Sequence, residues 1–121
     1  MSESAYFTGR TTIAPEVLVS IIKLTVLSVP GVSRLAPVPG RVNLLSKKEA
    51  ADGVEISVEN NTVYADVYAI FLHDVNVRDV SRSIQHQVAR AVSEMVGMEV
   101  GKVNVHVEDI DYQTNTEKAN L

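Results

Sequence analysis

The residues that could form a metal site or a catalytic pair are three histidines and the carboxylates near them in the sequence. His106 and Glu108 alternate along one stretch, so in a strand both would lie on the same face. A third ligand would have to come from another strand, with Asp66 the nearest candidate, and nothing in the sequence fixes it. His73 and His86 lie in other segments, and no histidine belongs to a short-spaced ligand motif. The sequence therefore assigns no metal ligand.

The remaining routes to an enzyme are also poorly supported. The pair His73-Asp74 stands before an expected helix, but no serine between elbow glycines accompanies it. The six glycines are scattered, and the run Val38–Arg41 has neither P-loop nor dinucleotide spacing. We therefore expect a protein that is not an enzyme, with no catalytic residue and no cofactor.

The composition is that of one globular domain in a reducing compartment. The 121 residues are 45% hydrophobic and 21% charged, and none is cysteine. A domain of this size buries enough surface to fold without disulfides or metals. Residues 1–7 show no basic and apolar leader, and the longest apolar stretch, Val17–Val29, is too short to cross a bilayer. These features predict a cytoplasmic protein without direct membrane insertion.

The charge balance makes nucleic acid an unlikely partner. The net charge is -4 and the sequence pI is about 5.3, the wrong sign for binding that depends on phosphate neutralisation. The alternative function that stays open is a small RNA-binding module. It would use a local basic region made of Arg34, Arg41, Lys47 and Lys48. Neither the GxxG clamp of KH domains nor the aromatic motif of RRM domains is present.

Two helices are indicated by their end signals and apolar spacing. Pro15 suits a first helical position and Pro30-Gly31 closes the segment, which predicts a helix from Pro15 to about Val29. Asn76 is a suitable cap for a second helix, whose apolar residues recur at helical spacing as far as Met95. Gly97 ends this second helix.

A β-hairpin is the clearest strand signal. Apolar residues alternate from Val54 to Val58 and again from Val63 to Phe71, and Asn60-Asn61 between them favours a tight turn. Further strands are expected at 9–13, 32–36 and 103–107, with a polar connection over 37–53.

This order of elements predicts an α/β (α+β) fold built as a two-layer sandwich. Both helices would cover one face of a small mixed or mostly antiparallel sheet. We expect a flexible N-terminus over residues 1–8, a single domain over 9–111 and a flexible polar tail over 112–121.

The first helix is apolar around most of its circumference, which is more than one sheet contact requires. Either the chain itself covers the excess, or another molecule does. Val19, Ile22 and Val26 are therefore candidate interface residues.

The second strand of the hairpin offers another candidate surface. Opposite its buried face it carries Tyr64, Asp66 and Tyr68, followed by Ile70 and Leu72. Tyrosine is favoured in protein interfaces, so Tyr64 and Tyr68 are candidate contacts, with His106 and Glu108 as neighbours if the last strand pairs nearby.

Several segments, taken in order and spacing, resemble the alkaline-shock and general-stress protein family of bacterial envelope stress response proteins. The resemblance covers about residues 9–109, and its most specific part is the closing run Val-Asn-Val-His-Val-Glu-Asp. The other segments are Gly9-Arg10, Ile13–Val17, Val29–Val32 and Glu94–Val100. The sequence departs from the family at Thr11-Thr12 and in the long polar loop from Arg41 to Gly53.

The resemblance implies a small cytoplasmic, non-enzymatic stress response protein. It further implies a homo-oligomer that acts as a scaffold or adaptor at the inner face of the membrane, where a membrane-anchored protein holds it. The family offers no catalytic or ligand-binding residue to transfer to this chain.

Overall fold

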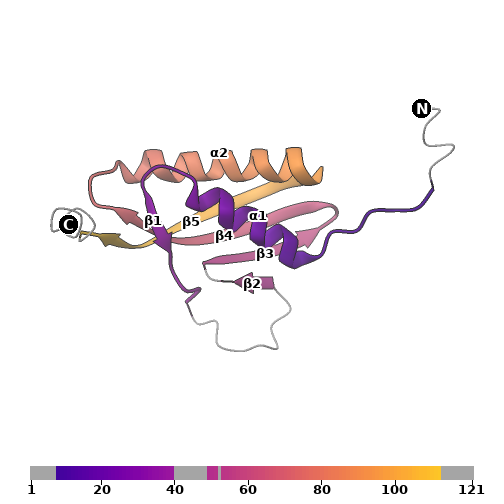
Figure 1. Cartoon of the computed structure of the whole chain (residues 1–121), viewed down its shortest axis with the longest axis horizontal. Coiled ribbons are helices and arrows are strands. Elements are labelled where there is room, and N and C mark those ends of the chain that lie inside the picture. The colour runs from indigo at the N-terminus through magenta and orange to yellow at the C-terminus, as the bar shows by residue number, and fades with distance from the viewer. Residues whose placement is uncertain (1–7, 40–48, 52, 113–121) are drawn as a thin grey trace, which may run out of the picture.

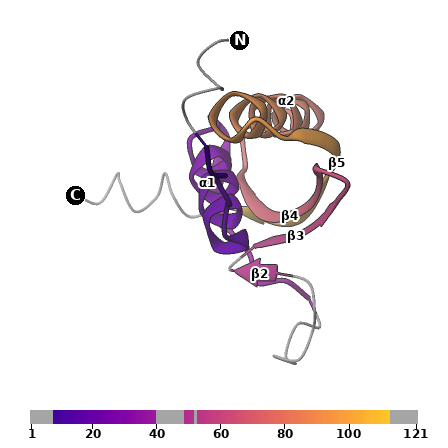
Figure 2. The same ribbon diagram turned by 90° about the vertical axis from the view of Figure 1, so that its right-hand side faces the viewer.

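The chain forms the expected two-layer sandwich, with both helices on one face of a five-stranded sheet (Figures 1 and 2). The computed structural model describes residues 8–39, 49–51 and 53–112. The helices are α1 (Pro15–Leu27) and α2 (Val77–Val96). The strands are β1 (Val32–Leu35), β2 (Glu49–Ala51), β3 (Val54–Glu59), β4 (Thr62–Leu72) and β5 (Glu99–Asp111).

The sheet is built around β4. Along one side of β4, β5 pairs in parallel over the full length of the strand. Along the other side, β3 pairs with the first half of β4 and β1 with its last residues, both antiparallel. β2 extends the sheet beyond β3. The sheet is therefore mixed, and β5 forms one of its outer edges.

The predicted hairpin, the starts of both helices and the end of α2 are confirmed, whereas α1 ends at Leu27, two residues before the predicted Val29. Asn60 and Asn61 join β3 to β4 with φ values of 53° and 61°, the positive values that a type I′ turn requires. Pro15 is the first residue of α1. The side chain of Asn76 accepts a hydrogen bond from the backbone N–H of Asp79, and Gly97 ends α2 in the left-handed conformation.

Replacing the cap residue Asn76 by alanine is expected to cost about 1 kcal/mol of stability, because the N–H of Asp79 loses its acceptor. For a domain of this size the melting temperature should fall by about 4 °C. Thermal unfolding followed by circular dichroism measures this shift. The matched control is Gln87→Ala at an exposed position in the same helix, which should leave the melting temperature within a degree or two. Equal shifts for the two variants would contradict the capping role.

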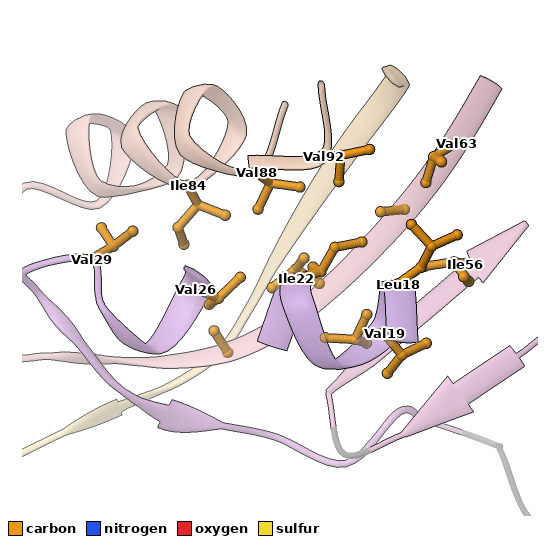
Figure 3. Close-up of a cluster of buried hydrophobic side chains, with 14 of the residues drawn as sticks. Leu18, Val19, Ile22, Val26, Val29, Ile56, Val63, Ile84, Val88 and Val92 are labelled. Atoms are coloured by element: carbon orange, nitrogen blue, oxygen red, sulfur yellow. The ribbon is translucent and has the colours of Figure 1, made fainter. Parts of the chain in front are cut away.

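The core lies between α1, α2 and the inner face of the sheet (Figure 3). Val19, Ile22 and Val26 are 5%, 0% and 0% exposed, respectively, so the structure corrects the prediction that they form an intermolecular surface. The reason is that α1 packs against α2 as well as against the strands, so two sides of the helix are covered within the chain. The broad apolar arc of α1 is therefore mostly core.

Two strand expectations were wrong. Residues 9–13 form no strand: they lead into α1 as an irregular segment without a strand partner among the described residues. The connection expected over 37–53 contains β2, because this short segment pairs its backbone with β3, although its Glu-Ala-Ala sequence shows no strand pattern. Residues 1–7 and 113–121, which make up nearly all of the expected N-terminal extension and tail, lie outside the described residues.

Candidate functional site

The two helices leave one face of the sheet uncovered (Figure 2). On this face, β4 and β5 carry a group of aromatic and polar side chains. The parallel register places Tyr64 opposite Lys102, Asp66 opposite Asn104, and Tyr68 opposite His106. Alternation along β4 directs the neighbouring residues Val63, Ala65 and Val67 into the core at 0–1% exposure. The outer sheet face is therefore the site where these side chains meet, as the sequence predicts for Tyr64, Asp66 and Tyr68.

A hydrogen-bond network fixes the centre of this face. One carboxylate oxygen of Asp66, Oδ1, accepts from Asn104 Nδ2 at 3.1 Å and from His106 Nε2 at 2.9 Å. Because a carboxylate only accepts, this geometry assigns the proton to Nε2 of the histidine. The Asp66–His106 contact is about one-third exposed, with side-chain exposures of 32% and 40%. The network therefore orients side chains at the surface rather than in a closed pocket.

The two tyrosines are held in different ways. The ring of Tyr68 stacks on His106, with centroids 4.4 Å apart and planes at 12°. The ring of Tyr64 lies against Gly101 so closely that a Cβ at position 101 would overlap it. A stacked and a packed aromatic ring, side by side with a polar network, form a surface whose side chains are held in place before any contact is made.

The far end of this face is less exposed than the sequence predicts. Ile70 lies on the same face as the tyrosines, because Ala69 and Phe71 on either side of it point into the core at 0% exposure, but Ile70 itself is only 9% exposed. A register shift between β4 and β5 next to Ile70 leaves Glu108 on β5 without a partner residue on β4. Glu108 is therefore not part of the Asp66–His106 network. No group of three metal-binding side chains occurs among the described residues.

The proposed basic region is only partly placed. Arg34 lies on β1, where its Nη1 is 3.0 Å from Oδ2 of Asp111, and Ser33 donates to the same oxygen at 2.6 Å. The other members, Arg41, Lys47 and Lys48, lie outside the described residues. The structure thus gives the RNA-binding alternative no support, because Arg34, the only member of this basic region among the described residues, already pairs with a carboxylate.

Two apolar features were not predicted from the sequence. A cavity of about 360 Å³ lies at the start of α1, lined mainly by Ile13, Leu18, Val58, Val96 and Met98. These residues come from three separate stretches of the chain, at the start of α1, in β3 and at the end of α2, so no local sequence signal marks the cavity.

The second feature is an exposed apolar stripe on α1. Val17, Leu24 and Leu27 are 46%, 69% and 42% exposed, respectively. The helical pattern predicts one broad apolar arc that includes Val17 and Leu24, but it does not indicate which members of the arc face outward.

Comparisons with known proteins cover nearly the whole domain. Residues 3–112 match the model of the alkaline shock protein 23 family, described as having a cell envelope-related function. The uncharacterized protein YqhY of Bacillus subtilis is 24% identical over 115 residues, covering 93% of this chain and 85% of YqhY. The uncharacterized protein Spy1535 of Streptococcus pyogenes serotype M6 is 32% identical over 105 residues, covering 86% of this chain and 81% of Spy1535. No solved structure matches the chain significantly.

Proposed function

This chain belongs to the alkaline shock protein 23 family, whose function is cell envelope-related, and from this membership we propose that it works as a non-enzymatic adaptor. The adaptor binds a membrane-anchored protein at the cytoplasmic side of the envelope and associates with copies of itself. The family has no known catalytic activity. The resemblance of residues 9–109 to envelope stress response proteins supports the same role.

The observation that carries the proposal is the outer sheet face defined by Tyr64, Asp66, Tyr68, Asn104 and His106. Within the described ranges no second layer covers this face, and it presents aromatic rings that neighbouring groups hold in place. Rigid, partly exposed tyrosines lose little conformational entropy on binding, which is why they act as anchors in protein interfaces. In this proposal the Asp66–His106 pair positions Tyr68 and has no catalytic role.

Attachment to the membrane is assigned to the partner. Among the described residues, neither helix is long and apolar enough to cross a bilayer. A partner that spans the membrane would supply the anchor, while this domain supplies the contact surface.

A photo-crosslinking experiment tests partner binding at this face. A benzophenone amino acid introduced at Tyr64, which is 38% exposed, should yield a crosslinked product in the membrane fraction of irradiated cells. The matched control carries the same amino acid at Gln87, exposed on α2 on the other side of the molecule, and should yield little product. Equal yields at the two positions would contradict the proposal, as would a Tyr64 product containing only copies of this chain.

A further inference from the structure

The outer edge of β5 is the longest strand edge in the structure that no described strand pairs. β5 is 13 residues long, whereas β2 at the opposite side of the sheet has three residues. Unpaired backbone groups along a long edge are a template for pairing with another strand. A short edge strand such as β2 presents few unpaired backbone groups and is therefore a poor template for such pairing.

The central part of this edge lacks the usual protection against pairing. Register shifts relative to β4 fall at Gly101 and at Glu108, and between them the ladder from Lys102 to Val107 is regular. The run Val103–Val107 contains no proline, aspartate, glutamate, lysine or arginine. Such charges and prolines are the means by which edge strands normally avoid each other.

Burial shows that this edge is incompletely covered. Val103, Val105 and Val107 point to the helical side of the sheet but stay partly exposed, whereas their neighbours Ala65 and Val67 on β4 are at 1% and 0%. α2 lies over β5, and Gln85 donates from Nε2 to the carbonyl of Val103 at 3.1 Å. Gln85 is itself exposed, so a pairing strand can replace this side-chain bond with a backbone bond.

We infer that β5 pairs antiparallel with β5 of a second copy, about a twofold axis through Val105, to form one continuous sheet. This register places Lys102 opposite Glu108 of the second copy. It also places Val103 opposite Val107, and Asn104 opposite His106. Every residue in the segment therefore meets an opposite charge, a hydrogen-bonding partner or a valine.

The charge pattern selects this arrangement. A parallel pair would place Lys102 beside Lys102 and Glu108 beside Glu108 of the second copy, and like charges in register are destabilising. The antiparallel pair joins opposite charges at both ends of the segment, and its twofold symmetry closes the assembly as a dimer. In the described part of the chain, neither Lys102 nor Glu108 forms an ion pair, so both are available.

The paired β5 edges would be the surface through which copies of this chain associate in the proposed function. Only this role in self-association rests on the proposed function. The outer sheet face continues across the pair, because Asn104 and His106 stand at its edge. Two copies would thus present their Tyr68–His106 stacks on one enlarged surface.

A charge-reversal experiment on the full chain tests the pairing and its register. Sedimentation velocity over a concentration series should show a dimer for the unaltered protein. K102E and E108K, each alone, should weaken dimerisation by about tenfold, since each places two like-charge pairs in the interface. The double variant K102E/E108K should restore the original affinity. Both side chains are exposed, so unchanged far-ultraviolet circular dichroism spectra serve as the control for folding, because the melting temperature itself falls when dimerisation weakens.

Three outcomes would overturn the inference: a monomer at every concentration, single variants that dimerise normally, or a double variant that fails to recover. Hydrogen exchange gives an independent reading, since alternate amides between Lys102 and Glu108 should become protected as the concentration rises. Crosslinking from Tyr64 to a membrane protein should persist in K102E. If the unaltered protein dimerises but gives no crosslink from Tyr64 to a membrane protein, that result would count against the proposed function alone.

Discussion

Replacing Val26 by arginine is expected to unfold the domain. Val26 is 0% exposed and points from α1 into the core that the two helices form with the sheet, near Ile22 and Ile84 (Figure 3). No buried polar or charged residue is found among the described residues, so the guanidinium would have no partner there. An unpaired buried charge costs roughly 4 kcal/mol or more, which is most of the stability of a domain that has about 5–15 kcal/mol in total.

Urea denaturation and thermal melting followed by circular dichroism measure this effect. The melting temperature should fall by at least about 15 °C, or the cooperative transition should disappear. The matched control is Leu24→Arg, two residues earlier in the same helix, where the side chain is 69% exposed. This control should change the stability by no more than about 0.5 kcal/mol. A Val26→Arg protein that melts like the unaltered one would mean that α1 does not dock as the structure has it.

The same pair of variants separates core from surface on α1. If the apolar arc of the helix were an intermolecular surface throughout, arginine at either position would impair association and leave folding intact. The structure instead predicts opposite behaviour for two residues that are nearly adjacent in sequence. The sequence pattern cannot make this distinction, because both positions belong to one arc of apolar residues.

Local elements of the fold could be predicted because their signals are local. Pro15 and Asn76 begin the helices, and Asn60-Asn61 has the backbone preferences of the turn it forms. The alternation of valines in β3 and β4 follows from one buried and one exposed face. These features depend on residues a few positions apart, so the sequence indicates them without any knowledge of which strands pair.

The long-range pairings could not be predicted in the same way. β1 and β3 share one side of β4, and β5 takes the whole of the other, but nothing in the valine pattern distinguishes these arrangements. The contact between Asp66 and His106 depends on the parallel register of β4 with β5. The sequence could therefore only suggest Asp66 as the nearest candidate partner for His106. β2 was missed because its pairing uses backbone groups, which every residue has.

Gly53 is the position where a single methyl group should do the most damage. Its φ is 76°, and a Cβ would lie 2.7 Å from Leu35 Cβ, 2.8 Å from the Tyr68 carbonyl oxygen and 2.9 Å from the Ala36 carbonyl oxygen. Two of these neighbours are backbone oxygens, and the Tyr68 oxygen is held by a hydrogen bond from the N–H of Ala36, so they cannot move aside as a flexible side chain can. Gly53→Ala is therefore expected to cost about 3 kcal/mol or more, combining left-handed strain with overpacking.

Gly97 provides a control with the same backbone angle. Its φ is also 76°, but a Cβ there would meet nothing within 4 Å. Gly97→Ala should thus cost only the strain of the left-handed conformation, about 1 kcal/mol. Urea denaturation of both variants measures the difference of about 2 kcal/mol or more, which isolates the steric part. Equal losses would show that the close approach around Gly53 does not exist.

The effect of Gly53→Ala should also reach the outer sheet face. The carbonyl of Gly53 accepts from the N–H of Tyr68 at 2.7 Å, and the carbonyl of Tyr68 accepts from the N–H of Ala36 at 2.9 Å. A methyl at position 53 pushes directly on the backbone that carries Tyr68, and through it on the stack with His106. In the fraction that still folds, Gly53→Ala should reduce crosslinking from Tyr64 more than Gly97→Ala does, because a displaced Tyr68 disrupts the surface to which both tyrosines belong.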